Sequence, residues 1–324
     1  MNRLYASIGI SKQSFHQKMD RLLQQRSEKQ QLLVLIYQIR QDHPTMGIRD
    51  MYFKLNPQTM GRDAFESFCK VQGLIAEKKR SFRKTTDSTG VIRFDNLLEK
   101  TSLSRINQVW QSDITYFEVK DRFFYITLVE DSYSRRIIGY SVSMRLTTEQ
   151  TTLPALRMAI KARSKDQMPT DGVIFHSDGG GQYYDKEFLR LTSKAGIINS
   201  MCLYPWENGK VERLNGVIKN NYLKHRSINS FESLRKEVDR SVYLYNHGKP
   251  HIKLGRKTPI QLENNYLRTG QQSDGEKSAT ELKTQNQKEF SALRAEDNNP
   301  SGSNIALELN TQKLKKSKKT VNVI

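Results

Sequence analysis

The sequence has few residues of the kinds that cross-link or anchor a protein. Only Cys69 and Cys202 occur among its 324 residues, too few for a disulfide framework, and neither has a second Cys or a His at zinc-finger spacing. A run of about 18 apolar residues, as a membrane span needs, is also missing. The first residues form no apolar signal segment. We therefore expect a cytoplasmic protein whose fold does not depend on zinc.

Acidic residues are scarce relative to basic ones. Lys and Arg number 53 against 34 Asp and Glu, a formal net charge of +19, and this excess favours a polyanionic partner, with nucleic acid as the first candidate. Apolar residues make up only 36% of the chain, which is low for a protein folded throughout. Residues 266–324, rich in Gln, Asn, Ser and Lys, are expected to form a disordered basic tail.

Residues 1–77 carry a helical pattern. Ser11 is expected to cap a short helix over KQSFHQKMDRLL, which resembles the second half of a helix-turn-helix, and a longer helix is expected over 27–42, ending at His43. Two further helices, the second over 62–72, match a complete helix-turn-helix in which Arg62 and Lys70 face DNA. A plain helical bundle has the same periodicity, so both interpretations stay open. Residues 78–104, which are basic and poor in apolar side chains, are expected to be a linker, either along phosphates or in solvent.

From residue 105 to 265 strands alternate with helices. Strands are expected over 109–119, 122–131 and 135–143, joined by tight turns into an antiparallel meander. A helix over 148–163, a strand over 172–178, a helix over 185–195, a strand over 197–201 and a final helix follow. Because a strand, a crossover helix and a further strand indicate parallel addition to a sheet, the order predicts an α/β core of the ribonuclease-H-like type.

Three acids stand in this core where apolar residues would be expected. Asp113 interrupts VWQSDITYFEV, Asp178 ends GVIFHSD before three glycines, and Glu212 lies in ENGKVERLNGVIKNNY. Alone, each has an ordinary explanation as a turn former or a solvated helix residue. If the two strands are neighbours and the helix crosses them, three carboxylates converge, which is costly unless divalent cations lie between them. The pattern therefore predicts a metal site.

The donor atoms of such a site indicate Mg²⁺, a hard ion that prefers oxygen. Two Mg²⁺ ions about 3.5 to 4 Å apart, with Mn²⁺ as a substitute, suit in-line phosphoryl transfer because they activate the attacking oxygen and stabilise the leaving one. His176 is either a substrate contact or a buried core histidine. On the last helix, spacing predicts a buried stripe and an adjoining face that looks into the site. The stripe is Val211, Leu214, Ile218 and Tyr222, and the face is Glu212, Asn215, Gly216 and Lys219.

Several segments together resemble bacterial insertion-sequence transposases of the DDE class, which are related to retroviral integrases. The blocks WQSDITYF, VEDSYSRRIIGYS, FHSDGGGQYYDKEF and ENGKVERLNGVIKNNY resemble the catalytic core, and YNHGKPHIKLGRKTPIQLE resembles its closing stretch. The resemblance covers roughly residues 5 to 265. Integrases proper carry a His-His-Cys-Cys zinc module in front, which this chain lacks, so the transposases are the closer relatives.

The resemblance implies that Asp113, Asp178 and Glu212 are the catalytic residues and metal ligands, with Asp113 bridging two ions. It implies Mg²⁺-dependent DNA cleavage and strand transfer on double-stranded element ends and target DNA by a homo-oligomer. Lys219 is expected near the element end; Lys210, Arg213 and Asn208 are further candidates for DNA contact. Related chains are often the downstream half of a frameshifted pair, so an upstream helix-turn-helix protein is a candidate partner.

Two departures bear on the third acid. The segment between Asp178 and Glu212 is slightly shorter than usual, and Glu207 replaces the family's commoner Asp ahead of Asn208. We expect Glu212 to be the ligand because a helix fixes its orientation, whereas Glu207 lies in a loop. The alternative function is a noncatalytic DNA-binding repressor derived from a decayed transposase, and the three retained acids favour the enzyme.

Overall fold

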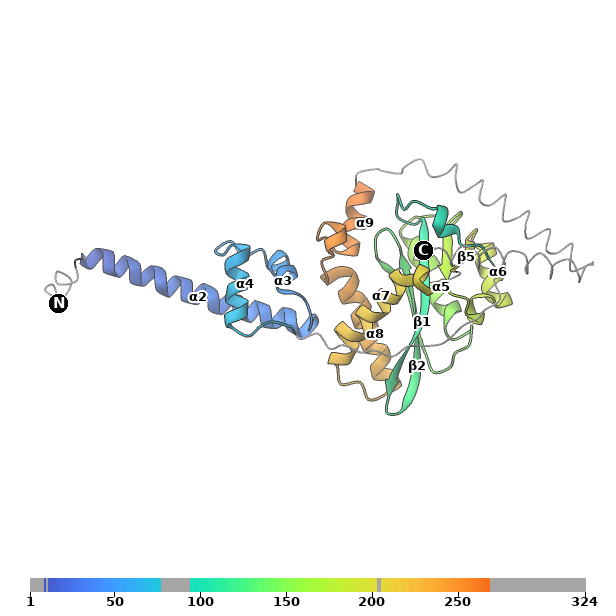
Figure 1. Ribbon diagram of the computed structural model, residues 1–324, viewed down its shortest axis with the longest axis horizontal. Coiled ribbons are helices and arrows are strands. Elements are labelled where there is room, and N and C mark those ends of the chain that lie inside the picture. The colour runs from blue at the N-terminus through green and yellow to red at the C-terminus, as the bar shows by residue number, and fades with distance from the viewer. Residues whose placement is uncertain (1–8, 10, 77–93, 203–204, 269–324) are drawn as a thin grey trace, which may run out of the picture. The chain divides into compact units, whose positions relative to one another are not determined.

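The computed structural model describes residues 9, 11–76, 94–202 and 205–268. They form a helical region and an α/β core with one five-stranded sheet (Figure 1). The predicted tail and residues 77–93 of the predicted linker lie outside the described residues. Within the described ranges, no helix is long and apolar enough to cross a membrane.

The helical region consists of α2 (Lys12–Asp42), α3 (Ile48–Leu55) and α4 (Arg62–Val71). Ser11 caps α2 as predicted, because its side chain accepts a hydrogen bond from the Ser14 backbone N–H at 3.1 Å. The predicted break before residue 27 is wrong, since α2 runs without interruption for 31 residues. No Gly or Pro occurs between residues 12 and 42, so nothing in the backbone ends the helix there. Helices α3 and α4 pack on α2 around the buried side chains of Ile36, Met51, Phe65 and Cys69.

The sheet contains β1 (Val109–Val119), β2 (Arg122–Asp131), β3 (Ile137–Ser143), β4 (Ile174–Ser177) and β5 (Ile198–Met201). Its strand order is β3-β2-β1-β4-β5. The first three strands are antiparallel neighbours, and β4 and β5 run parallel to β1, as predicted. Lys120 and Asp121 both have positive φ, at 48° and 61°, which is the two-residue turn that suits a tight hairpin.

Helices cover both faces of the sheet. On one face, α5 (Thr152–Lys165) and α6 (Lys186–Lys194) enclose a core that includes Trp110 and Phe175. On the other face, α7 (Gly209–Val217) and α8 (Phe231–Gly248) enclose a second core with Ile126 and Leu128. The last described helix is α9 (Pro259–Arg268). This is the predicted ribonuclease-H-like core, preceded by an all-α region.

Short turns complete the core. The 3-10 turns are η1 (Leu97–Lys100), η2 (Gly181–Tyr183), η3 (Pro205–Asn208), η5 (Leu223–His225) and η6 (Ile252–Leu254), and η4 (Ile218–Tyr222) is a π turn. Helix α5 begins four residues later than predicted, because residues 147–151 first form turns closed by their own backbone and hydroxyl hydrogen bonds to Thr147. The end of the predicted linker packs on the core, where the Leu97 N–H donates to Ser200 Oγ at 3.0 Å.

A buried ion-pair cluster joins α9 to the sheet. Arg163 on α5 is fully buried and donates to Asp131 at 2.7 Å and to Glu263 of α9 at 2.9 and 3.0 Å. Arg136 adds a bond of 2.7 Å to Glu263. Buried charges are tolerated only when paired in this way. The cluster therefore fixes the last helix of the core.

Candidate active site

Asp113 and Asp178 come level with each other on adjacent strands. Gln111 of β1 pairs in parallel with His176 of β4, so the residues two positions further on, Asp113 and Asp178, lie at the carboxyl end of β4. The backbone N–H of Gly180 donates to Asp178 Oδ1 at 3.1 Å. The glycine-rich turn after β4 thus orients one of the two carboxylates.

The carboxylate of Asp113 is surrounded by negative charge. Burial, and then the charges of Asp178 and Glu212, raise its pKa to about 7. Burial also raises the pKa of Asp178. Asn215 Nδ2 donates to Asp113 Oδ2 at 2.7 Å, which offsets the rise only in part.

Helix α7 brings Glu212 to this end of the sheet. The predicted stripe is buried: Val211, Leu214, Ile218 and Tyr222 are 0%, 3%, 1% and 2% exposed. At the start of α7, Asn208 Nδ2 donates to the Ser112 carbonyl oxygen at 3.3 Å, which ties the helix to β1 (Figure 1). Glu212 itself lies in the first turn of α7 with its side chain exposed.

The donor set suits a hard divalent cation, although the carboxylates are not yet gathered around one. Across the described ranges, no group of three His, Cys, Asp or Glu side chains is close enough together to hold a metal ion. Asp113 on β1 and Asp178 directly after β4 nevertheless offer oxygen ligands, and a cation would offset both causes that raise the pKa of Asp113, its burial and then the charges of Asp178 and Glu212. The side chain of Glu212 is exposed.

Two residues of the predicted face, Asn215 on α7 and Lys219 in the π turn η4, do contact β1, and α8 and α9 follow the helix that was predicted to be the last. In addition to the Asn215 contact, Lys219 Nζ donates to Thr115 Oγ1 at 2.6 Å and lies 5.4 Å from the centroid of the Tyr116 ring. Burial, followed by the charge of Lys224, lowers the pKa of Lys219. Sequence reasoning missed Thr115 as a partner of this lysine. The two-residue period of a strand could have identified Thr115, because it places Thr115 on the same face of β1 as Asp113.

The other predicted DNA-contact residues differ in accessibility. Arg213, Arg62 and Lys70 are exposed, and Arg62 Nε donates to Asp63 at 2.9 Å. Burial, followed by the charge of Arg135, lowers the pKa of Lys210. Asn208 is only 2% exposed, so its side chain serves the start of α7 and does not face solvent.

Two further residues had alternative interpretations. His176 is fully buried and shares a hydrogen bond of 2.9 Å between Nδ1 and Ser200 Oγ, which is the core-histidine interpretation. Burial lowers its pKa to about 4, so the ring is neutral at pH 7. Glu207 lies in η3, where its charge acts on His176 and on Cys202.

Comparison with known proteins gives two family matches in the core. Two models that are each described as an integrase core domain match residues 104–203 and 197–259. They meet between Asp178 and Glu212, so the three acids lie within the matched residues.

Insertion-sequence proteins are similar over most of the chain. Transposase InsF for insertion sequence IS3A of Escherichia coli is 32% identical over 203 residues, which are 60% of this chain and 68% of the relative. An uncharacterized 31 kDa protein of insertion element IS600 from Shigella sonnei is 29% identical over 271 residues, 80% of this chain and 97% of the relative. Among solved structures, the HTLV-2 integrase catalytic core domain in complex with magnesium aligns with 48% of this chain and 95% of its own, at 21% identity and a TM-score of 0.38.

Proposed function

Since the chain belongs to the bacterial insertion-sequence transposases of the retroviral integrase superfamily, we propose that it catalyses Mg²⁺-dependent DNA cleavage and strand transfer at the ends of its element. The observation that carries the proposal is the setting of Asp113. Burial and the charges of Asp178 and Glu212 raise its pKa to about 7. A carboxylate with a raised pKa beside two further acids is frequent at functional sites.

In this proposal Asp113, Asp178 and Glu212 hold two Mg²⁺ ions, for which Mn²⁺ can substitute. Mg²⁺ held by these residues would supply activation of the attacking oxygen and stabilisation of the leaving oxygen in an in-line displacement at phosphorus. Asn215 orients the Asp113 carboxylate through its bond of 2.7 Å. The Gly180 N–H does the same for Asp178.

The proposed DNA contacts divide between the two regions. Lys219 bonds Thr115 on the face of β1 that carries Asp113, and it is proposed to exchange this bond for a phosphate of the element end. Arg213 and Lys210 would add charge beside it. In the helical region, Arg62 and Lys70 on α4 are exposed and are proposed to contact duplex DNA.

The remaining parts of the proposal concern assembly. We propose that the chain acts as a homo-oligomer that holds two element ends, and that an upstream helix-turn-helix protein of the same element assists recognition. A DNA substrate places the reaction in the bacterial cytoplasm. The chain is proposed to be organised as a helical DNA-binding region over residues 1–77, a linker over 78–104, a catalytic core over 105–265 and a tail over 266–324.

A gel assay with purified protein tests this function. The substrate is labelled duplex DNA carrying the element's own ends, and the controls are a scrambled end, EDTA, and Asp113→Asn. We expect a labelled product joined to target DNA with Mg²⁺ or Mn²⁺ that disappears in all three controls. Specific binding to the ends without any product in either metal would instead favour the noncatalytic repressor.

A further inference from the structure

The helix that carries Glu212 does not continue as an α-helix. After Val217 the chain enters the π turn Ile218–Tyr222 and then the 3-10 turn Leu223–His225. A π turn adds about one residue per turn, so the residues beyond it are rotated by about 100° relative to an uninterrupted α-helix. Such turns are rare and frequently occur at functional sites. The directions of the side chains beyond the turn therefore depend on it, and its widened backbone also carries Lys219.

The π turn presents one residue to the candidate active site and another to the helical region. Lys219 reaches β1, where it donates to Thr115 Oγ1 at 2.6 Å. Tyr222 is 2% exposed, and its hydroxyl shares a hydrogen bond of 3.1 Å with Nδ1 of His43. His43 caps the end of α2 and is 4% exposed. Only two residues of the same turn, Asn220 and Asn221, thus separate the two contacts.

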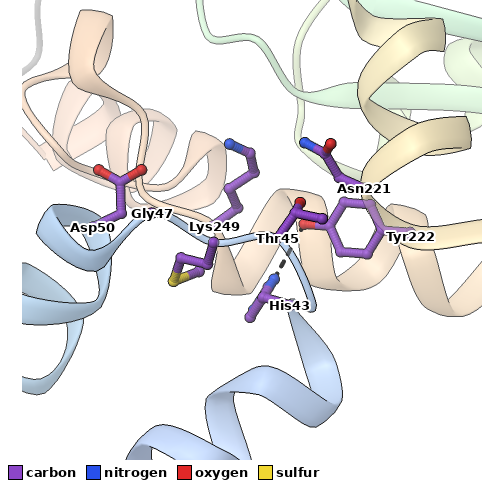
Figure 2. A pocket seen from close by; sticks show the side chains of 8 residues that line it. His43, Thr45, Gly47, Asp50, Asn221, Tyr222 and Lys249 are labelled. Atoms are coloured by element: carbon purple, nitrogen blue, oxygen red, sulfur yellow. Dashed lines mark hydrogen bonds between the residues drawn. The ribbon is translucent and has the colours of Figure 1, made fainter. Parts of the chain in front are cut away.

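The contact between His43 and Tyr222 borders a cavity of about 90 Å³. Figure 2 shows Asn221 and Tyr222 on one side of this space, with His43 and Thr45 across from them and the hydrogen bond between the two rings. The rings also meet edge to face, with centroids 5.8 Å apart. Close packing resists a change of helix geometry, and Ile218 and Tyr222 of the turn are packed in the core. On the side that borders the cavity, the hydrogen bond and the ring contact with His43 hold the turn.

Other contacts hold the helical region against the core without touching the π turn. Lys54 Nζ donates to the Gly248 carbonyl oxygen at 2.9 Å, and Arg240 pairs with Asp42 at 2.7 Å. Loss of the hydrogen bond between His43 and Tyr222 consequently leaves the two regions joined. This separation allows the role of the bond to be tested by itself.

We propose that His43 and Tyr222 are positioning residues, whose hydrogen bond keeps the π turn in the register that directs Lys219 toward the face of β1 that carries Asp113. In this way the attachment of the DNA-binding region completes the arrangement of the active site. The role of Lys219 in the reaction rests on the proposed function above. The placement of Lys219 does not rest on the proposed function, and it can be measured without DNA.

The first experiment measures the accessibility of the Lys219 amine in the full-length protein. Reductive methylation followed by mass spectrometry compares the wild type with Tyr222→Phe and His43→Leu, which remove the bond from either side. We expect Lys219 to be labelled about tenfold faster in both variants, the factor that corresponds to one hydrogen bond. The control Arg240→Gln, which breaks a contact at the same junction, should label at the wild-type rate. Unchanged labelling in both variants, or equal acceleration in the control, overturns the proposal.

The second experiment asks whether Tyr222 acts through Lys219. We expect Tyr222→Phe to lower the kcat of strand transfer about tenfold with unchanged affinity for element ends. In a Lys219→Met background the same substitution should have no further effect, because coupled residues are not additive. A further loss of kcat when Tyr222→Phe is added to Lys219→Met would contradict a positioning role. If the wild type itself transfers no strands, the proposed function fails, and the labelling result alone decides the positioning of Lys219.

Discussion

Replacing Asp113 with Asn should abolish strand transfer and at the same time stabilise the metal-free protein. In the folded state the pKa of Asp113 rises from an ordinary value of 3.8 to about 7, chiefly through burial and then through Asp178 and Glu212. Ionising this carboxylate at pH 8 therefore opposes folding. Asn keeps the shape, still accepts the bond from Asn215, and carries no charge.

The magnitude follows from linkage. Between pH 4 and pH 7 the folded state retains a proton that the unfolded chain releases, so stability falls as pH rises through this window by about 1.4 kcal/mol per unit. The full span amounts to about 4 kcal/mol, and relaxation around the site reduces it, so we expect Asp113→Asn to gain about 2–4 kcal/mol at pH 8. Below about pH 4 the gain should vanish, because Asp113 is then protonated in both states.

Urea unfolding in EDTA at pH 8 and at pH 4 measures this difference, and added Mg²⁺ supplies a second comparison. Mg²⁺ should stabilise the wild type and leave Asp113→Asn almost unchanged, since a ligand stabilises only the state that binds it. A variant that is less stable than the wild type at pH 8 in EDTA, or equal stabilisation of both proteins by Mg²⁺, would refute the reasoning.

Further predictions concern the charge network, the DNA and the domains. Glu263→Ala should lower the free energy of unfolding in urea by about 3–5 kcal/mol, because it leaves Arg163 buried with fewer partners. The control Glu187→Ala breaks an exposed pair with Arg190 and should lower it by at most about 1 kcal/mol. Hydrogen bonds to Arg163 lower the pKa of Glu263 against the effect of its burial, so its contribution should be lost as pH falls below the ordinary glutamate range, which unfolding in acid will measure. Binding to duplex DNA should weaken linearly with salt on logarithmic axes, and a flat response would contradict the phosphate contacts. Residues 1–77 alone should bind element ends without cutting them; equal recognition by residues 105–265 alone would show this division to be wrong.

Most of the sheet could be predicted from the sequence, but the long-range polar contacts could not. Both bounds of β1 and of β2 follow from strand patterning and from the turn at Lys120 and Asp121. The bond between Arg163 and Glu263 joins residues 100 positions apart, and no local periodicity reports such a pair. Helix ends are also poorly predicted by sequence patterns where threonine side chains form hydrogen bonds with the nearby backbone, as they do before α5.

The candidate site shows the same division. Helical spacing over residues 209–222 correctly placed Val211 and Leu214 in the core and Lys219 toward the strands. It gave no sign of the π turn, because a stripe at 211, 214, 218 and 222 also fits a continuous α-helix. Asn208, at the start of α7, is buried and donates to the carbonyl oxygen of Ser112 on β1. The family resemblance alone did not reveal this contact.

The identity of the third acid tests the proposed metal site most directly. Glu212 lies on α7 and acts on Asp113, whereas Glu207 lies in η3 and acts on His176. Glu212→Gln and Glu207→Gln remove one charge each at nearly constant size, so they form a matched pair. We expect Mg²⁺-dependent strand transfer to collapse in Glu212→Gln, with element-end binding retained, and to persist at a substantial level in Glu207→Gln. The reverse result, in which Glu207→Gln is inactive and Glu212→Gln still transfers strands, would contradict the proposed metal site.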